Sequence, residues 1–378
     1  MKKFLFSLMA VAIMATVFIS CEKEEPTGSE GIAGSIGSGE TVTLKAGEDY
    51  LLDGPLLVEA GGTLNIEAGT VIKAKKGFSN YILVLQGGKI NANGTATNPI
   101  RMTAGNSGAE SGYWGGLIIN GNAPLAGGST GSTEINSVYT YGGTVADDNS
   151  GIITYVILEY TGARSSADVE HNGLTLNGVG SGTKIENIYV TEGSDDGIEF
   201  FGGTVNVKNL LVVNSDDDMF DFTQGYAGTL ENAYGVWEQD FSSTESDPRG
   251  IEADGNFDGN FPEHIGQSNF VVKNMTIELK LAKNDAEGHY MHDVIKIRRG
   301  ATATITNALV KGTGQVKDLI DLTDGKGNAS AGTQISLTSS LTNSISGKSV
   351  NGDNANAKVE AENTGCATDI FSWTGYAF

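Results

Sequence analysis

A short phrase that returns about every 22 residues constrains the fold of this chain more than any other feature. Each copy places an asparagine between a polar and an apolar residue, and the asparagines are Asn187, Asn209, Asn232, Asn274 and Asn307. The steps between them are 22, 23, 42 and 33 residues, so the third step is close to two periods and the fourth contains an insertion. A period of this length is typical of solenoids, in which each repeat stacks on the preceding one.

A second phrase keeps the same spacing. The segment 194–200 aligns with the segment 216–222 at an offset of 22 residues, and both alternate apolar and polar residues as strands do. The regular leucines and the helical half of a leucine-rich repeat are absent from the sequence. We therefore predict an all-β fold, a single-stranded right-handed parallel β-helix of roughly 22 residues per coil with inserted loops.

Stacked coils convert equivalent positions into columns, with neighbouring strands about 4.8 Å apart. The repeat predicts an asparagine ladder at one turn, where side-chain amides bond their neighbours and tolerate left-handed backbone. It also predicts inward apolar columns, formed by Ile198, Phe200, Phe220, Phe222, Ile295 and Ile297. We assign residues 40–378 to the β-helix. Residues 39–50 are the expected cap of the first strand edge, and the aromatic segment 370–378 is expected to close the far end of the core.

The N-terminus has the features of an export signal. Lys2 and Lys3 precede an apolar run over residues 4–19, which is shorter than the roughly 20 residues of a membrane-spanning helix. The run ends at Ser20 and Cys21, a pair that resembles the lipobox of bacterial lipoproteins. We expect residues 1–20 to be a signal peptide, Cys21 to carry the lipid anchor, and the Gly/Ser-rich segment 21–39 to be a flexible tether.

The charge of the chain restricts its classes of binding partner, and its cysteine content restricts its disulfide bonds. Without Lys2 and Lys3 the chain has 22 basic and 46 acidic residues, a net charge of −24, which disfavours binding to nucleic acid. Cys366 is the one other cysteine, so no intramolecular disulfide is expected once Cys21 is lipidated. The acidic run 22–25 resembles the surface-export signal of Bacteroidota lipoproteins, which implies an outer-membrane protein facing the exterior. An ordinary tether facing the periplasm is the alternative.

Longer phrases also carry a resemblance. They are the run 114–124 with Trp114, the run 171–183 from His171, the run 199–206 and the run 216–221. Together they resemble a family of Bacteroidota outer-membrane lipoproteins with pectin-lyase-like β-helices. The resemblance covers nearly all of the mature chain and implies the fold and the location, but it implies no established activity.

An acidic face is the first candidate site. Its members are Asp195, Asp196, Glu199, Asp217, Asp218 and Asp221, which the 22-residue offset places on adjacent coils. Glu199 and Asp221 should point outward side by side, and such a pair favours a neutralising calcium ion. Asp196, Asp217, Asp218 and His289 could instead act as the acid and base of a polysaccharide lyase or a polygalacturonase-like hydrolase. The alternative is that these aspartates bond the backbone at turns.

A second candidate is half of a calcium loop. Asp254, Asn256 and Asp258 place oxygen atoms at alternate positions before a glycine, but Ile265 stands where the closing glutamate of such a loop belongs. A plain turn would use the same residues. The pair His289 and His292 is not expected to bind zinc, because strand positions three apart face opposite sides.

Two classes of function remain open at this stage. One is a binding or scaffold lipoprotein whose partner is a glycan or an outer-membrane protein. Its aromatic residues Tyr139, Tyr141, Trp237 and Phe257 could stack on sugar rings or cover the core. The other is a glycan-cleaving enzyme with Arg249 or His289 near the acids. An open cleft over the acidic face would favour the enzyme, and burial of the aspartates would favour the binding protein.

Overall fold

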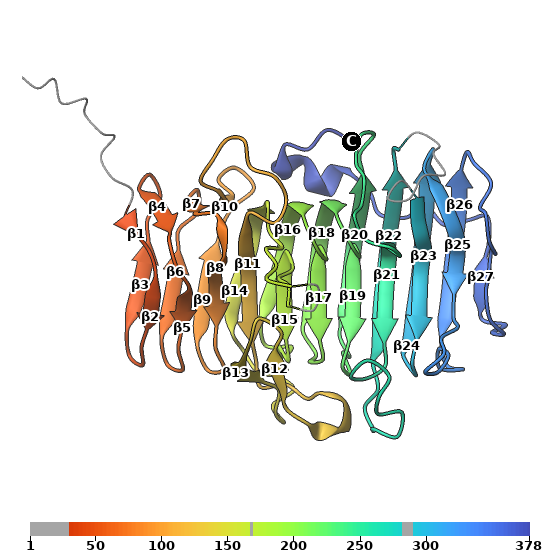
Figure 1. Cartoon of the computed structure of the whole chain (residues 1–378), viewed down its shortest axis with the longest axis horizontal. Coiled ribbons are helices and arrows are strands. Elements are labelled where there is room, and N and C mark those ends of the chain that lie inside the picture. Colours follow the sequence, from red (N-terminus) through yellow and green to blue (C-terminus); the bar gives the residue numbers. More distant parts are fainter. Residues whose placement is uncertain (1–29, 167–168, 282–289) are drawn as a thin grey trace, which may run out of the picture.

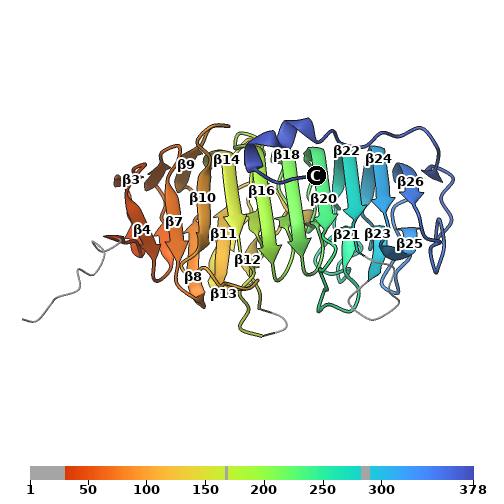
Figure 2. The ribbon, with the colours of Figure 1, turned by 90° about the horizontal axis from the view of Figure 1, so that it is seen from above.

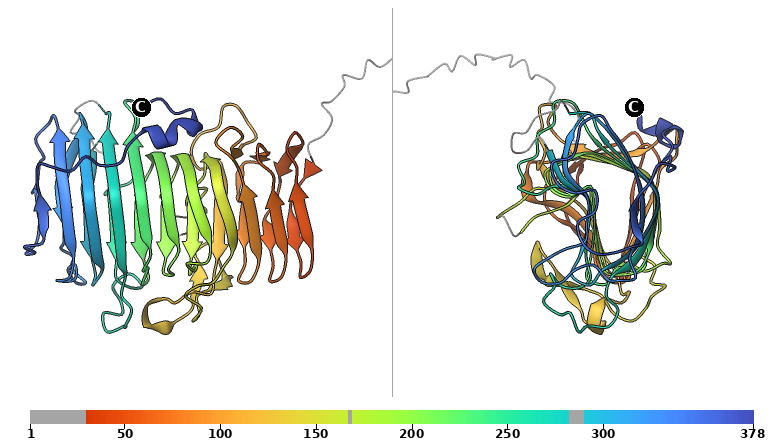
Figure 3. Two further views of the ribbon diagram at one scale, coloured as in Figure 1. Left: turned by 180° about the vertical axis from the view of Figure 1, so that it is seen from behind. Right: turned by 90° about the vertical axis from the view of Figure 1, so that its right-hand side faces the viewer.

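The computed structural model, which describes residues 30–166, 169–281 and 290–378, is a parallel β-helix (Figure 1), as the repeat predicts. Its strands form a 15-stranded sheet A and a 10-stranded sheet B, and a separate two-stranded hairpin joins β12 (Gly131–Thr133) to β13 (Asn136–Tyr141). Viewed along the long axis, the coils superimpose as a flattened tube with this hairpin outside it (Figure 3). Within these ranges no helix has the length and apolar character needed to span a bilayer.

Each coil contributes to both sheets. Sheet B contains β2 (Gly34–Ile36), β5 (Leu56–Val58), β8 (Gly77–Val84), β11 (Trp114–Asn120), β15 (Leu174–Asn177), β17 (Ile198–Phe201), β19 (Phe220–Thr223), β21 (Arg249–Asp254), β23 (Tyr290–Arg298) and β25 (Gln315–Asp321). The main path of sheet A contains β1 (Glu30–Gly31), β4 (Asp49–Leu52), β7 (Val71–Ala74), β10 (Ile100–Ala104), β14 (Gly151–Glu159), β16 (Lys184–Gly193), β18 (Asn206–Ser215), β20 (Thr229–Trp237), β22 (Asn269–Leu279), β24 (Thr302–Gly312), β26 (Gln334–Leu341) and β27 (Ala357–Val359). Its side branch contains β3 (Thr41–Leu44), β6 (Thr63–Ile66) and β9 (Lys89–Asn93).

Two lines of short strands merge in β14. Residues 151–154 pair with β9, residues 156–158 pair with β10, and Tyr155 between them has a left-handed backbone with φ 51°. The predicted asparagines occupy this position in the later coils, with φ between 54° and 60°. Their ladder is confirmed, because each Nδ2 donates to the Oδ1 of the preceding asparagine over 2.8–2.9 Å. Asparagine tolerates the bend, and its amide repeats the hydrogen bond from coil to coil.

The apolar columns are also confirmed. All six residues predicted to point inward are fully buried. The Phe200 and Phe222 rings stack with centroids 5.0 Å apart, and Phe222 stacks on Phe270 at 4.2 Å. The next member of this column is Ala253, and Phe270 of β22 in the opposite sheet extends the aromatic stack into the third coil.

The β-helix begins earlier than the predicted boundary at residue 40. β1 pairs with β4 and β2 pairs with β5, and Ile32 and Ile36 are buried. Part of the predicted tether 21–39 therefore belongs to the first coil of the β-helix. The predicted cap over residues 39–50 is wrong for the same reason, since it forms β3 and β4. Glycines between apolar residues supply the turns of these first coils. Residues 1–29, with the predicted signal peptide and Cys21, lie outside the described residues.

The C-terminal segment does not close the end of the core. Residues 364–378, the C-terminal strap, run back over the outer face of sheet A, and their 3₁₀ helix η2 (Asp369–Thr374) lies over β16 and β18 (Figure 2). The sequence prediction was wrong because the sheet has an apolar stripe of its own to cover. That stripe consists of Ile157, Tyr189, Leu211, Val213, Tyr234 and Val236.

Candidate functional site

The acidic face lies on the outer side of sheet B. Strand register places Glu199 opposite Asp221 and Asp221 opposite Glu252, which confirms the predicted 22-residue offset. Asp196 and Asp218 lie in the turns just before β17 and β19, where the Asp218 amide donates to Asp196 Oδ1 at 2.9 Å. These carboxyl groups therefore stand beside one another on adjacent coils. Glu252 belongs to the same column, and its place in the aligned phrase could have identified it from the sequence.

Half of the acidic face is buried, whereas Asp195, Asp217 and Asp221 are half-buried. Glu199 is 8% exposed, Asp196 is 6% exposed and Asp218 is 2% exposed, although these side chains point away from the core. The β12–β13 hairpin covers residues of β11, β15 and β17, and its Tyr141 donates to Gln224, just after β19, over 2.8 Å. The space beneath the hairpin is about 10 Å³, which is roughly one water molecule. The predicted outward direction is right, but Asp196, Glu199 and Asp218 do not open onto a cleft, because each of them is buried.

Several carboxyl oxygens on this face have no partner among the described residues. They are one oxygen each of Asp217, Asp218 and Asp221. Glu199 Oε2 accepts from the Asn172 amide at 2.6 Å, and Asp196 accepts the backbone bond already described, as the turn interpretation requires. A buried carboxylate without a donor is costly, so these oxygens need a proton or a cation.

The protein supplies cations to only part of this face. Arg249 pairs with Glu252 at 2.5 Å and lies 3.9 Å from Asp218. Farther along sheet B, Lys296 pairs with Asp321 at 2.6 Å, so the downstream coils neutralise themselves. Positive charge is therefore concentrated from β21 onward and at Arg164, which lies 3.6 Å from Asp216. Asp196, Glu199 and Asp221 between them have no lysine or arginine partner within the described residues.

The pKa values follow this imbalance. Burial first, and neighbouring carboxylates second, hold the pKa values of Asp196, Glu199, Asp218 and Asp221 well above their ordinary range. Burial and the Glu252 charge raise the pKa of Asp217 to about 7. Three sets of carboxylates on this face have ligand oxygens within 4.8 Å of one another, Asp195/Asp196/Asp217, Asp196/Glu199/Asp221 and Asp218/Asp221/Glu252. The unpartnered oxygens and the hard oxygen donors together fit a calcium ion.

The second candidate loop is already neutralised. Asp254 Oδ2 binds Arg299 Nη1 at 2.7 Å, and the same guanidinium binds Asp258. Asn256 is buried, and its amide donates to Gln267 at 2.8 Å while its Oδ1 accepts from the Phe261 amide. A calcium ion bound between the two aspartates would have to displace Arg299, so this loop fits an ion less well than the acidic face does.

The remaining candidates are placed as follows. His289 lies outside the described residues. His292 Nδ1 is 2.9 Å from Asp293, and its Nε2 is 2.9 Å from Lys317 Nζ, away from the upstream acids. Tyr141 and Trp237 are buried, which shows that they cover the core and loops, whereas Tyr139 and Phe257 are half-buried.

Comparison with known proteins agrees with this architecture. Residues 34–376 match the family model of the pectate-lyase-like β-helix domain. The chain belongs to this family. No curated protein and no solved structure matches the chain. Membership in the pectate-lyase-like family is compatible with binding and with polysaccharide degradation, because a shared fold does not decide activity.

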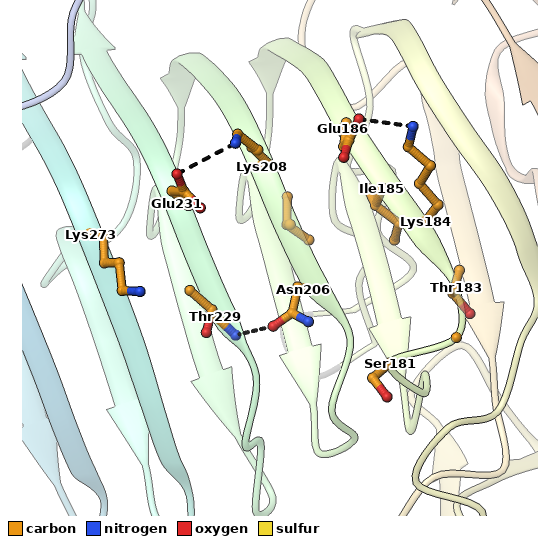
Figure 4. Close-up of a pocket in the computed structure, with 12 residues that line it drawn as sticks. Ser181, Thr183, Lys184, Ile185, Glu186, Asn206, Lys208, Thr229, Glu231 and Lys273 are labelled. Atoms are coloured by element: carbon orange, nitrogen blue, oxygen red, sulfur yellow. Dashed lines mark hydrogen bonds and ion pairs between the residues drawn. The ribbon is translucent and has the colours of Figure 1, made fainter.

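This pectate-lyase-like chain also has an open polar groove, on the outer face of sheet A (Figure 4). The groove encloses about 480 Å³ at the start of β16, β18 and β20. Its polar and charged lining consists of Ser181, Thr183, Lys184, Glu186, Asn206, Lys208, Thr229, Glu231 and Lys273. Lys184 pairs with Glu186 at 3.1 Å and Lys208 pairs with Glu231 at 3.5 Å, while Lys273 has no ion pair within the described residues. The sequence analysis missed this groove, because its residues are ordinary surface positions of the repeat.

Proposed function

We propose that this protein is a lipid-anchored outer-membrane binding or scaffold protein, and that it does not cleave glycans. The burial of Asp196 and Asp218 is the observation that supports this choice. General acid–base catalysis requires a carboxyl group within hydrogen-bond distance of the bond that breaks. Asp196 is 6% exposed and Asp218 is 2% exposed, so neither carboxyl group is accessible to a sugar ring at the surface.

The polar groove is the surface that we assign to the ligand. Lys208 and Asn206 are exposed there, and Thr229 and Glu231 stand beside them on the next strand. Amide, hydroxyl and charged groups in successive rows suit a glycan, which offers many hydroxyl groups and needs both donors and acceptors. A protein of the outer membrane is the second partner class, and it would contact the same exposed rows.

Anchoring rests on the N-terminal sequence. Two acyl chains on Cys21 would hold the protein at the membrane, since a single chain binds only weakly and reversibly. The acidic segment after Cys21 supports export to the cell surface. The β-helix would then present the polar groove at the outer membrane.

We assign a structural role to calcium on the acidic face. Asp196, Glu199 and Asp221 would hold the ion, because no lysine or arginine pairs with them within the described residues. A bound ion supplies the positive charge that these three carboxyl groups lack. In this proposal calcium stabilises the β-helix and takes no part in a reaction.

The test uses the soluble form that starts at Glu22, presented to arrays of neutral and acidic oligosaccharides. Binding should occur without shortening of the glycans, and it should weaken in the double variant Asn206→Ala/Lys208→Ala. Lys358→Ala, an exposed lysine on β27, is the matched control. Release of shorter products that is lost in Asp218→Asn would overturn the proposal in favour of an enzyme.

A further inference from the structure

A second groove, which we call the tyrosine groove, lies on the outer face of sheet A at the opposite end of the strands. It encloses about 620 Å³ along β7, β10 and β14, beside the loop that follows β10. Lys73, Thr103, Asn106, Glu159 and Tyr160 line it. It shares no residue with the polar groove or with the acidic face. A volume of this size holds one or two sugar rings.

Tyr160 is held in a backbone conformation that does not suit its side chain. Its φ is 61°, in the left-handed region that bulky residues rarely occupy. The equivalent positions of the next two coils, Glu192 and Asn214, have φ 55° and 56°, and there Asn214 Nδ2 donates to Glu192 Oε1 at 2.7 Å. Tyr160 takes no part in this ladder. An aromatic residue therefore replaces a polar one where the fold itself would favour asparagine, and such strained positions cluster at functional sites.

The backbone around Tyr160 is fixed. Its amide donates to the Thr191 carbonyl at 3.1 Å, and its own carbonyl accepts from the Tyr113 amide at 2.9 Å. The preceding carbonyl, that of Glu159, accepts from the Trp114 indole at 2.8 Å. These bonds tie β14 to the end of the loop that borders the groove. The backbone that carries the half-buried Tyr160 is thus preorganised and needs no ordering when a ligand binds.

The polar groups around the ring are complementary to hydroxyl groups. The Glu159 carboxylate is oriented by an ion pair with Arg101. Lys73 and Asn106 are exposed, and Lys73 forms no ion pair within the described ranges. A tyrosine ring offers an apolar face, and the surrounding carboxylate, amide and ammonium offer acceptors and donors. That combination matches a pyranose ring, which has one apolar face and a rim of hydroxyl groups.

We propose that the tyrosine groove is a saccharide-binding site in which one sugar ring stacks on Tyr160 and its hydroxyl groups bond Glu159, Asn106 and Lys73. The inference rests on the proposed function for the class of ligand, a glycan. It adds a second contact region, at a position where the next two coils have the polar residues Glu192 and Asn214.

The decisive variant is Tyr160→Asn. Asparagine relieves the backbone strain, so the melting temperature should stay the same or rise, while the affinity for the glycan should fall about tenfold. The probes are xylohexaose, mannohexaose and trigalacturonate, titrated by calorimetry against the soluble form from Glu22. Tyr160→Phe keeps the ring and should retain affinity within about threefold, a change of less than 1 kcal/mol. Tyr155→Asn is the control, because Tyr155 is a half-buried tyrosine of the adjoining strand β14 with φ 51° that does not line the groove.

The outcomes separate the two proposals. If the wild type binds a probe and Tyr160→Asn binds it equally well, the tyrosine groove is not a saccharide site, and the binding function stands. If the wild type binds none of these probes and none of the arrayed glycans, both proposals of a glycan ligand fail. Equal losses in Tyr160→Asn and Tyr160→Phe would show that the ring does not act by stacking, and would also overturn the inference.

Discussion

Glu199 on β17 lies directly opposite Asp221 on β19, and neither carboxyl group has a lysine or arginine partner in the ranges that the structure describes. Strand spacing brings two like charges to within about 5 Å of each other in a region that water scarcely reaches. Their coexistence requires protons or a cation. The protein's stability should therefore respond to both pH and calcium.

Stability without calcium should fall as the pH rises from about 4 to about 7. Burial raises the pKa of Asp217 to about 7, and those of Asp196, Glu199 and Asp221 are raised as well. A carboxyl group with a higher pKa in the folded protein binds its proton more tightly there. Its contribution to stability is therefore fully present below the pKa of the unfolded chain and is lost as the pH rises through the pKa of the folded protein. We expect a loss of about 2–4 kcal/mol across this range, measured by guanidinium unfolding with chelator present.

A matched pair of variants checks this pH dependence. Asp217→Asn should flatten the pH profile, because the amide does not titrate, whereas Asp353→Asn, at an exposed position, should leave it unchanged. A wild-type profile that rises from pH 4 to 7 would contradict the assigned direction of the pKa shifts.

Calcium should raise the melting temperature at neutral pH and remove most of the pH dependence. An ion present at 100 times its Kd stabilises the fold by about 2.7 kcal/mol. Asp221→Asn should abolish the response, because Asp221 is one of the three proposed ligands and belongs to two of the three carboxylate sets on this face. Asp258→Asn should keep it, because Arg299 and Lys326 already neutralise that side chain. If Asp258→Asn alone lost the response to calcium, the calcium site would lie in the loop of Asp254, Asn256 and Asp258 and not on the acidic face.

Asn232→Ala should destabilise the protein by about 2–3 kcal/mol. The substitution removes two ladder bonds of 2.8 Å and 2.9 Å and places a Cβ-bearing residue without a compensating amide at φ 60°. Asn232→Gly removes the same bonds, but glycine adopts the left-handed backbone conformation without strain. Its loss of stability should therefore be about 1 kcal/mol smaller. Unfolding in guanidinium measures both, and equal losses would show that backbone strain plays no part.

The C-terminal strap should be separable from the rest of the β-helix. Phe371→Ala removes a fully buried ring over Tyr234 and should cost about 3–4 kcal/mol, or less if the strap detaches first. Detachment exposes the apolar stripe of sheet A, so a hydrophobic dye should bind the variant before the coils unfold. Phe378→Ala, at a ring that is 42% exposed, should show little of either effect. Dye binding that coincides with global unfolding would show that the strap is not separable.

Most of the coil could be predicted from the sequence, because stacking forces equivalent residues into columns. The Asn187 to Asn307 ladder and the Phe200/Phe222 stack follow directly from the repeat. The same logic placed Glu199 beside Asp221. The prediction that residues 370–378 close the end of the core was wrong, because their apolar character does not reveal which apolar surface they cover.

The sequence by itself determined the parallel β-helix, its period and the order of its columns, since these depend on contacts between residues at a fixed separation. Only the tertiary structure decided that half of the acidic face is buried and that Arg249 neutralises one end of it. It also decided that the strap covers sheet A and that Tyr160 borders an open groove. Those features depend on where insertions of irregular length fold back onto the coils. No repeat specifies that, because each insertion occurs once and finds its place through contacts far apart in the chain.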